Sequence, residues 1–298
     1  MQRWWQKFVN NLVFEKTVSS PHSHVLIDGL AFPEAPRWRN NCLWFTDQHA
    51  RQIRWVDLSG QGGMLAEMDD LPGGLGWLPD GTPLVVAMTS RRLYRVLEET
   101  FELHADLSSL ASFHCNDMLV DNQGRAYVGN FGYDLHGGAE VVPTGLIMVR
   151  PDGHASVVAH DLVFPNGMTL TPDGELLVAE TFAHRLSAFT VAENGQLSDR
   201  RTWAELGDAT PDGVCLDAEG AVWVASPESG DVLRVREGGE IIERVSPTGT
   251  PYACLLAGPD RKLLFMLTAE TDDPVDAARL RSGRIEIHAV TVAGAGIP

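Results

Sequence analysis

Four residues whose side chains carry oxygen atoms recur at nearly the same distance ahead of short apolar segments. Asn116, Asn166 and Asp212 each lie ten residues before such a segment begins, and Glu34 lies nine residues before one whose preceding turn is one residue shorter. Two carboxylates and two carboxamides form a hard-oxygen set that suits Ca²⁺, and Mg²⁺ or Mn²⁺ are compatible with it. Zinc fits less well because it usually takes nitrogen or sulfur ligands. A shared metal site requires the fold to bring these four positions together.

The apolar segments that define this spacing belong to a repeat of the whole chain. They are LWFTD, LVVAM, AYVGN, LLVAE, VWVAS and LLFML, and they begin at Leu43, Leu84, Ala126, Leu176, Val222 and Leu263, at intervals of 41, 42, 50, 46 and 41 residues. A polar turn precedes each segment, and a strand of alternating polarity follows most of them. A period in the forties with about four strands per unit is typical of propeller blades. The sequence therefore predicts an all-β protein, a six-bladed β-propeller with a central metal site.

A β-sandwich or a jelly roll would also show short strands at regular spacing. The fixed order of turn, apolar segment and alternating strand, repeated six times, favours the propeller. We expect residues 24–298 to form it, with the strand from His24 closing the ring against the last blade, and residues 1–23 to form an N-terminal extension. The extension is either an amphipathic segment that docks on the propeller or a disordered start. Long helices are not expected.

Equivalent positions of the blades surround the central axis, so the four oxygen-bearing residues are expected to converge at one mouth of the channel. The same count of ten residues leads to Gly74 and Ala253 in the other two blades. These small residues leave one side of the site open to a ligand. Any one of the four residues alone is explained as a turn former. Their coincidence favours a metal, because uncompensated carboxylates in a narrow channel would repel each other.

Composition narrows the classes of partner and compartment. The net charge of −17 and the pI near 4.9 argue against nucleic acid, which needs a basic surface. The first sixteen residues contain no continuous apolar core, so we expect neither a secretory signal nor a membrane span. The four cysteines are far apart and form no C-x-x-C motif, which favours reduced thiols in the cytoplasm. The sequence leaves open whether the protein is a monomer or a homo-oligomer.

Four motifs carry a resemblance to a known family. They are FPEAPRW from Phe32, NDMLVDNQGRAYVGN from Asn116, FPNGMTLTPDGELLVAET from Phe164 and TPDGVCLDAEGAVWVAS from Thr210. Through them the chain resembles, over residues 24–292, the family of senescence marker protein 30 (regucalcin), gluconolactonase and luciferin-regenerating enzyme. The resemblance implies a six-bladed propeller that binds a divalent metal through Glu34, Asn166 and Asp212, with Asn116 on the substrate side.

One position departs from the family pattern. Sugar-lactone members carry an arginine two residues before the asparagine that corresponds to Asn116, and this chain has His114 at that position. Without a guanidinium fork, a less hydroxylated lactone or another ester is expected in place of a sugar lactone.

The resemblance implies a metal-dependent lactonase, in which the metal polarises the lactone carbonyl. Asp212 would accept the proton of the attacking water, and Asp117 is a second candidate base. Asn116, His114, Tyr133 and Asp134 are the candidate substrate-binding residues. Tyr133 and Asp134 lie in NFGYDLHGG, which is either a loop that covers the substrate or an exposed glycine-rich excursion.

Two other functions stay open at this stage. A metal that polarises C=O also polarises P=O, so an esterase or a phosphotriesterase is an alternative to the lactonase. A non-catalytic propeller that binds Ca²⁺ is the other, since fold does not decide function. A serine hydrolase triad is disfavoured because no G-x-S-x-G motif occurs in the chain.

Overall fold

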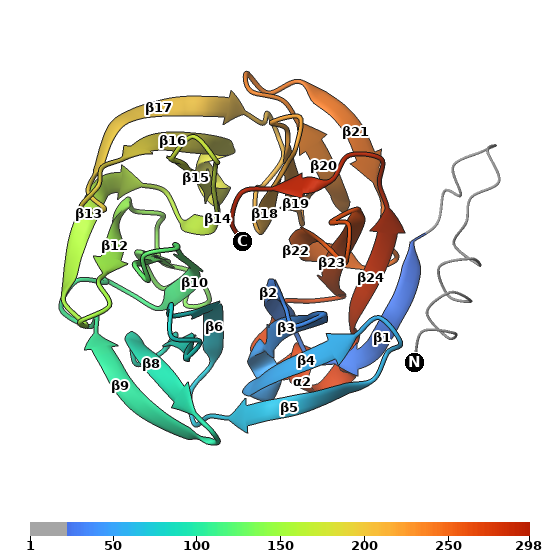
Figure 1. Ribbon diagram of the computed structural model, residues 1–298, viewed down its shortest axis with the longest axis horizontal. Helices are drawn as coiled ribbons and strands as arrows, with labels where there is room; N and C mark the ends of the chain where they lie inside the picture. The colour runs from blue at the N-terminus through green and yellow to red at the C-terminus, as the bar shows by residue number, and fades with distance from the viewer. Residues whose placement is uncertain (1–22) are drawn as a thin grey trace.

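The computed structural model describes residues 23–298, which form six antiparallel β-sheets around a central axis (Figure 1). The prediction of an all-β, six-bladed propeller is confirmed. We number the blades by the position of their innermost strand in the chain. In blades 1 to 5 the chain runs outward, from the strand at the axis to the strand at the rim.

The blades have the following strands. Blade 1 contains β2 (Pro33–Arg39), β3 (Cys42–Asp47), β4 (Gln52–Asp57) and β5 (Gly62–Glu67). Blade 2 contains β6 (Pro72–Trp77), β7 (Pro83–Ala87), β8 (Arg92–Leu97) and β9 (Thr100–Asp106). Blade 3 contains β10 (Cys115–Val120), β11 (Ala126–Asn130), β12 (Thr144–Val149) and β13 (Ala155–Leu162). Blade 4 contains β14 (Pro165–Leu170), β15 (Glu175–Glu180), β16 (Arg185–Val191) and β17 (Leu197–Glu205). Blade 5 contains β18 (Val214–Asp217), β19 (Val222–Ser226), β20 (Asp231–Val235) and β21 (Ile241–Val245). Blade 6 contains β22 (Thr250–Ala257), β23 (Leu263–Ala269) and β24 (Gly283–Ala289).

The fourth strand of blade 6 comes from the other end of the chain. Strand β1 (His24–Leu30) pairs antiparallel with β24, and His24 lies opposite Ile287. The first and last parts of the propeller therefore hold the ring closed, as the sequence predicts. The predicted N-terminal extension, residues 1–23, lies outside the described residues except for its last member.

The six apolar segments of the repeat are the second strands of the blades. Every residue of β11 and of β19 is buried, because these strands are sandwiched between neighbouring blades and have no face toward solvent. Trp223 of β19 is the largest fully buried side chain among them, with 1% of its surface exposed. Burial of a large apolar side chain contributes about 1.5–3 kcal/mol. The contacts between blades therefore supply much of the stability that keeps the axis aligned.

The last described residues lie across the channel at the mouth where the innermost strands end. Strand β25 (Gly294–Ala295) pairs with β18, and Ile297 exchanges two backbone hydrogen bonds with Leu170 of β14, at 2.7 and 3.0 Å. Figure 1 shows the C-terminus close to the centre of the ring. The opposite mouth, where the innermost strands begin, carries the predicted site.

Helical structure within residues 23–298 is limited to the α-helix α2 (Pro274–Leu280) and the short 3₁₀ turns η1 (Gln48–Ala50) and η2 (Thr181–Ala183). The expectation that long helices are absent holds for this part of the chain. None of these helices has the length and apolar character needed to cross a membrane.

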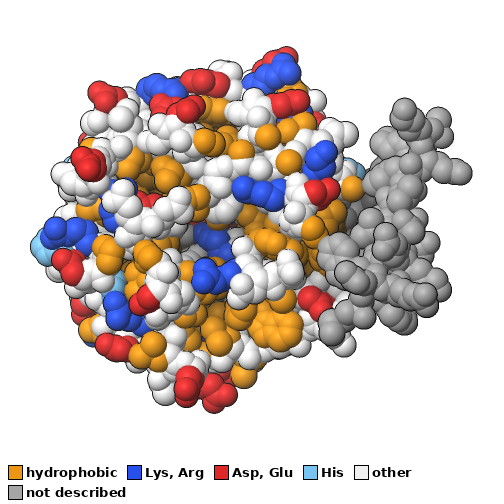
Figure 2. Space-filling model, viewed as in Figure 1, with side chains coloured by type: hydrophobic (Ala, Val, Ile, Leu, Met, Phe, Trp, Pro, Cys, Tyr) orange, Lys and Arg blue, Asp and Glu red, His pale blue; other side chains and the backbone are white. Residues whose placement is uncertain are grey.

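The distribution of surface charge and the state of the cysteines agree with what the composition predicts. On the face seen in Figure 2, basic side chains are interspersed with acidic and apolar ones and form no continuous stripe. All four cysteines, which lie within the described residues, are free, and Cys115, Cys215 and Cys254 are buried while Cys42 is partly exposed. Burial raises the pKa of the Cys254 thiol, which lies against Cys215.

Candidate functional site

The four predicted residues lie at the same mouth of the channel. Glu34, Asn116 and Asn166 are each the second residue of an innermost strand, and Asp212 lies two residues before β18. A β-bulge follows Glu34 in β2, Asn116 and Asn166 lie within bulges of β10 and β14, and a bulge interrupts the same part of β6 and β22. Bulges redirect side chains out of the regular alternation of a strand. The repeated bulge is therefore a common device by which the blades can direct the second residue of the innermost strand toward the axis.

Strand pairing corrects the sequence alignment of blade 2. The hairpin of β6 and β7 closes with Trp77 opposite Pro83, so the apolar segment at Leu84 begins one residue inside its strand. Pro72 occupies the position of Pro165, and the residue that corresponds to Asn166 is therefore Gly73. The prediction of Gly74 was wrong by one residue. Blade 6 presents Ala253, as predicted, so the two small positions flank blade 1.

Glycines bring the innermost strands of adjacent blades close together. A Cβ atom on Gly167 would lie 2.4 Å from the backbone oxygen of Asp212, and one on Gly213 would lie 2.6 Å from the Cα atom of Ala253. Both distances are too short for real side chains. Asn166-Gly167 and Asp212-Gly213 are therefore more than turn formers, since the glycines allow the neighbouring backbone to reach the axis.

Three carboxyl groups gather at this mouth with little positive charge to balance them. Burial, and then the charge of Asp117, raise the pKa of Glu34 to about 8. Burial raises the pKa of Asp212, and the charges of Glu34 and Asp117 raise it further. Among residues 23–298 neither Glu34 nor Asp212 forms an ion pair. Both side chains remain partly accessible, so they line a space and are not packed inside the core.

Asp117 differs from these two because it has a partner. Its Oδ1 atom accepts hydrogen bonds from Nη2 of Arg37 at 3.3 Å and from the backbone nitrogen of Met118 at 2.7 Å. Burial raises the pKa of Asp117, and Arg37 opposes that shift. Arg37 itself is 8% exposed and also donates to the backbone oxygens of Pro36 and Met118. Asp117 is thus part of a structural ion pair, which makes Asp212 the freer of the two candidate bases.

The carboxamide of Asn166 is held by a threonine. Its Nδ2 atom donates to Oγ1 of Thr181 at 3.3 Å, and Thr181 donates to the backbone oxygen of Pro211 at 2.8 Å. Asn166 is 7% exposed. The contact also links the mouth-facing end of blade 4 to the residue just before Asp212.

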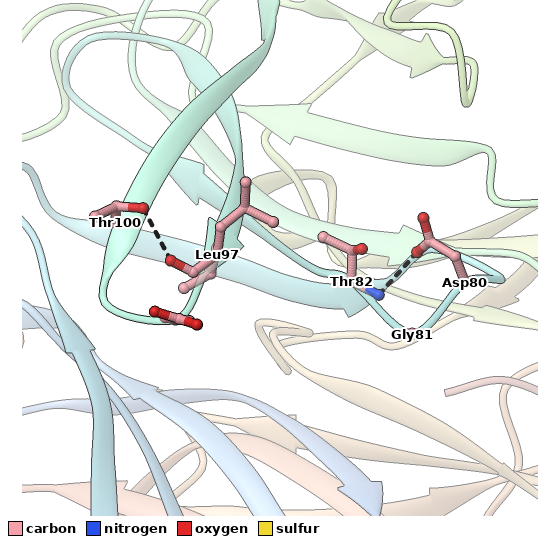
Figure 3. Close-up of a pocket in the computed structure, with 7 residues that line it drawn as sticks. Asp80, Gly81, Thr82, Leu97 and Thr100 are labelled. Carbon is pink, nitrogen blue, oxygen red and sulfur yellow. Dashed lines mark hydrogen bonds between the residues drawn. The ribbon is translucent and has the colours of Figure 1, made fainter.

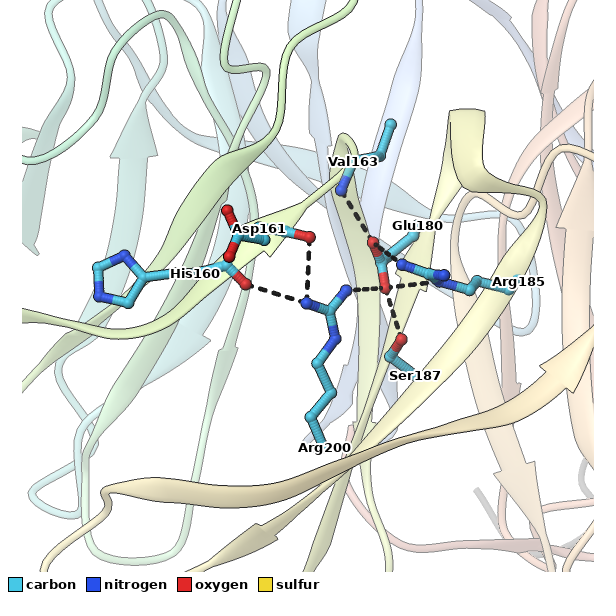
Figure 4. Close-up of polar contacts among 7 residues, drawn as sticks. All are labelled: His160, Asp161, Val163, Glu180, Arg185, Ser187 and Arg200. Atoms are coloured by element: carbon cyan, nitrogen blue, oxygen red, sulfur yellow. Dashed lines mark hydrogen bonds and ion pairs between the residues drawn. The ribbon is translucent and has the colours of Figure 1, made fainter.

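Polar residues at the ends of the second strands anchor the loops that lead to the site. Asp47 accepts hydrogen bonds from the backbone nitrogens of Ala31 and Phe32, at 2.9 and 2.8 Å. In blade 4, Oε2 of Glu180 accepts one from the backbone nitrogen of Val163 at 2.8 Å, and Figure 4 shows the same carboxylate surrounded by Arg185, Ser187 and Arg200. In blade 5, Ser226 accepts one from Thr210 at 3.2 Å. The polar last letters of LWFTD, LLVAE and VWVAS are the signal that would have identified this set.

The predicted substrate residues lie at the same end of blade 3. His114 stacks on Phe113, with ring centres 4.2 Å apart, and burial lowers its pKa. Tyr133 is 6% exposed, and its buried hydroxyl has no hydrogen-bond partner in the part of the chain that the structure describes. Asp134 is exposed, and its carboxylate accepts a hydrogen bond from the backbone of Gly137 at 2.8 Å. The segment NFGYDLHGG therefore combines a buried tyrosine with an exposed turn.

Blade 6 contributes residues that the sequence reasoning missed. The ring of Tyr252 lies 4.6 Å from that of Phe32. Burial raises the pKa of Tyr252, and the charges of Asp272, Asp212 and Glu34 add to the rise. Tyr252 directly precedes Ala253, so the same count that identified Ala253 points to it. Asp272 lies in the loop before α2, outside the repeat, and no spacing rule could have found it.

A cation at this mouth would depend on amide oxygens as well as carboxylates. Within residues 23–298, no three His, Cys, Asp or Glu side chains are placed as a metal-ligand group. Two carboxylates and two carboxamides do fit a hard cation, and a positive charge would offset both the burial and the repulsion that raise the pKa values of Glu34 and Asp212. The donor set is therefore compatible with calcium.

An open hollow of about 530 Å³ lies elsewhere, between the β6–β7 and β8–β9 turns of blade 2 (Figure 3). Thr82 donates its backbone N–H to Asp80 at 2.9 Å, and Thr100 donates to the backbone oxygen of Leu97 at 2.9 Å. These bonds stabilise the turns themselves. The hollow brings no set of reactive groups together and is not a candidate site.

Comparison with known proteins identifies the family. The profile described as the SMP-30/Gluconolactonase/LRE-like region matches residues 32–270. The chain belongs to this family. The SMP-30/gluconolactonase/LRE-like match includes all four residues at the mouth, and the family assignment made from the motifs is confirmed.

Relatives of this family member include named lactonases. The chain is 28% identical to the pentonolactonase of Haloferax volcanii, over 77% of this chain and 81% of that protein, and 27% identical to the regucalcin of Danio rerio, over 79% and 82%. A 6-deoxy-6-sulfogluconolactonase of Pseudomonas putida is 29% identical over 52% of this chain, and the match spans about half of that protein. Lactone hydrolysis is thus represented in the family.

Solved structures agree on the fold. The luciferin-regenerating enzyme superposes with a TM-score of 0.80 at 16% identity, covering 93% of this chain and 99% of that one. The calcium-binding regucalcin of Agrobacterium tumefaciens superposes with a TM-score of 0.77 at 22% identity, covering 93% and 96%. At these identities the likeness establishes the propeller architecture.

Proposed function

We propose that this protein is a metal-dependent lactonase that opens a cyclic ester to a hydroxy acid at the mouth formed by blades 1, 3, 4 and 5. The observation that carries the proposal is that neither Glu34 nor Asp212 has an ion-pair partner among residues 23–298, although the charge of Glu34 disfavours ionisation of Asp212 and two carboxamides lie beside them. Such an arrangement is unfavourable without a cation. Family members with lactonase names support the same reaction class.

Glu34, Asn166 and Asp212 would hold the cation, which we propose to be Ca²⁺, and Asn116 would lie toward the substrate. Mg²⁺, Mn²⁺ and, less favourably, Zn²⁺ are the alternatives. When bound, the cation would supply Lewis-acid polarisation of the ester carbonyl and stabilise negative charge on its oxygen. The two small positions, Gly73 and Ala253, would leave room for the lactone beside it.

Asp212 is the proposed proton acceptor for the attacking water. It has no ion-pair partner among the described residues, whereas Asp117 already accepts from Arg37. The Asn116 carboxamide would orient the ester by donating a hydrogen bond to it. Arg37 is a positioning residue in this scheme, because it holds Asp117 and the backbone oxygen of Met118 next to Asn116. Location in the cytoplasm stays a prediction, which the free cysteines support.

The direct test is a pH-indicator assay on a panel of lactones, run on cation-free protein and after addition of Ca²⁺, Mg²⁺, Mn²⁺ or Zn²⁺. We expect chelator-sensitive turnover, restored by Ca²⁺, and a loss of about 10²-fold or more in Asp212→Asn. Asp173→Asn is the matched control, because Asp173 lies exposed in the β14–β15 turn. An Asp212→Asn variant as active as the control would refute the mechanism.

The same panel separates the alternatives. One organophosphate triester tests the phosphotriesterase, which would show chelator-sensitive release of its leaving group and no lactone turnover. A propeller that only binds cations would show calcium binding by isothermal titration calorimetry and no turnover of either class.

A further inference from the structure

Aromatic rings gather beside the site, on blades 3 and 4. Phe131 stacks on Phe164 with ring centres 4.5 Å apart, and Phe182 lies edge-on to Phe164 at 5.0 Å. His114 lies 6.0 Å from Phe131, and Tyr133 lies 6.1 Å from Phe164. We call these residues, with Phe113, the aromatic wall. The wall adjoins the site directly, since His114 and Phe164 each lie two residues before a predicted site asparagine.

Part of the aromatic wall faces solvent. Phe182 is 37% exposed, and Phe113 and His114 are half-buried. The loop before β12 adds Val141 and Val142, which are 51% and 44% exposed. Large apolar side chains are seldom left exposed together without a reason, and adjacent exposed ones mark binding surfaces. Here they lie at the one mouth that carries unpaired carboxylates.

The Tyr133 hydroxyl is a buried polar group inside the wall. It has no hydrogen-bond partner among residues 23–298, while the ring of Tyr133 lies within 6.4 Å of both Phe164 and Phe182. A buried hydroxyl without a hydrogen bond is unfavourable and points to a missing partner. An oxygen atom of a substrate bound at the mouth would supply an acceptor.

The positions that ring the mouth suit an apolar substituent more than a polyol. The residues two places before the site position in the six blades are Phe32, Leu71, His114, Phe164, Thr210 and Pro251. Histidine is the only ionisable side chain among these six, and none of the six offers the planar fork of donors that binds paired hydroxyls. Sugar hydroxyls placed against these rings would lose their hydrogen bonds to water without replacement.

We infer that the mouth takes lactones that carry an aromatic or alkyl substituent, which lies against the aromatic wall while the ester faces Asp212. This inference rests on the proposed lactonase function and specifies its substrate class. Phe182 and Tyr133 are the specificity-determining residues, the first through contact with the substituent and the second through a hydrogen bond from its hydroxyl to the substrate.

The test compares kcat/KM for four lactones in the presence of Ca²⁺. They are γ-butyrolactone, γ-phenyl-γ-butyrolactone, γ-nonalactone and D-glucono-δ-lactone. The phenyl and alkyl lactones are expected to exceed the unsubstituted ring by roughly 10- to 100-fold, as expected for burial of that much apolar surface. The sugar lactone is expected to be the poorest substrate.

Two variants test which residues of the aromatic wall contribute to kcat/KM for these lactones. Phe182→Ala should lower kcat/KM for the phenyl lactone by about fivefold or more and leave γ-butyrolactone within about twofold. Leu103→Ala is the matched control, because Leu103 is 51% exposed on β9 at the rim of blade 2. Tyr133→Phe should lower kcat/KM for all the hydrolysed lactones without lowering the melting temperature, since it removes an unpaired buried hydroxyl.

The results that would overturn this inference differ from the result that would overturn the proposed function. Hydrolysis of D-glucono-δ-lactone in preference to the phenyl and alkyl lactones would overturn the inference and leave the lactonase intact. Equal turnover of substituted and unsubstituted rings, or an unchanged Phe182→Ala variant, would also overturn it. Absence of turnover for all four lactones would overturn the proposed function and the inference together.

Discussion

The hydroxyl of Thr181 accepts a hydrogen bond from the carboxamide nitrogen of Asn166 at 3.3 Å. Thr181 must accept in this contact, because its single proton is donated to the backbone oxygen of Pro211 at 2.8 Å. The nitrogen of Asn166 is therefore turned toward Thr181, and its Oδ1 atom accepts no hydrogen bond from residues 23–298. A residue of η2 thus decides which end of the amide a ligand would meet.

Thr181→Val should weaken cation binding because it removes the acceptor that orients Asn166. Residues that orient metal ligands contribute about 10- to 100-fold to affinity, and we expect a loss of about tenfold for Ca²⁺ by isothermal titration calorimetry. Thr181→Ser keeps the hydroxyl and should bind within about twofold of the natural protein. Equal affinities for the valine and serine variants would contradict the orienting role.

Gly167→Ala should disturb the site without removing any ligand. The new Cβ would lie 2.4 Å from the backbone oxygen of Asp212, so the backbone at Asp212 or at Gly167 would have to shift. We expect weaker calcium binding and a loss of activity of at least about tenfold, since small displacements at a site are costly. Gly174→Asn is the control, because a side chain there meets nothing within 4 Å and asparagine tolerates the positive φ of 88°. A fully active Gly167→Ala variant would show that this close approach is not needed.

Asp212→Asn should make the cation-free protein more stable while it abolishes stabilisation by the cation. The variant removes one of two carboxyl groups whose charges burial and mutual repulsion disfavour. We expect the melting temperature without cation to rise by about 2 °C, which corresponds to about 1 kcal/mol. Adding Ca²⁺ should raise the melting temperature of the natural protein and of Asp173→Asn only. A fall in the melting temperature of cation-free Asp212→Asn would mean that Asp212 stabilises the fold.

Glu180→Gln should destabilise the propeller. Glu180 is fully buried and is bonded to Arg185 at 3.0 Å and to Arg200 at 2.7 Å (Figure 4). Breaking a buried ion pair costs about 3–5 kcal/mol, and we expect a loss toward the lower end of that range in urea unfolding. Glu175→Gln is the control, because Glu175 pairs with Arg201 at the surface and such pairs contribute about 0–1 kcal/mol.

The Glu180 network also predicts an acid dependence. Burial raises the pKa of Glu180, but the bonds from Arg185, Ser187 and Arg200 outweigh burial and leave the pKa below its ordinary value of 4.5. A carboxyl group whose pKa is lower in the folded state stabilises the fold above the unfolded pKa, and that contribution is lost as the pH falls through the folded pKa. The stability difference between the natural protein and Glu180→Gln should therefore shrink below about pH 4.5. A constant difference down to the lowest measurable pH would contradict this assignment.

Much of the fold follows from the repeat because each blade is encoded locally. The second strands read as apolar segments since both of their faces are buried between blades, and the turns before them are rich in Asp, Asn and Gly. The strand from His24 was predicted to close the ring, and its pairing with β24 confirms this. The alignment was wrong at Gly74, because β7 begins with a proline and the alignment took the first apolar residue after it, Leu84, as the start of the strand.

The contacts that surround the site could not be predicted from the sequence. The ion pair between Arg37 and Asp117 joins blades 1 and 3, which are 80 residues apart at these positions. Thr181 reaches Pro211 across the gap between blades 4 and 5. Tyr252 and Asp272 approach Asp212 from blade 6 and from the loop before α2. None of these contacts has a local pattern, because each depends on the distance between blades.

The sequence by itself determined the number of blades and the family, and it predicted four oxygen-bearing residues at equivalent positions, because these depend on periodic patterns that the blades repeat. Only the tertiary structure decided which carboxyl groups are paired, which end of Asn166 is free and that the histidine at the mouth lies in a wall of aromatic rings. The physical reason is that charge and hydrogen-bond balance at the axis depend on side chains from several blades at once, and their separation is set by how closely the innermost strands pack.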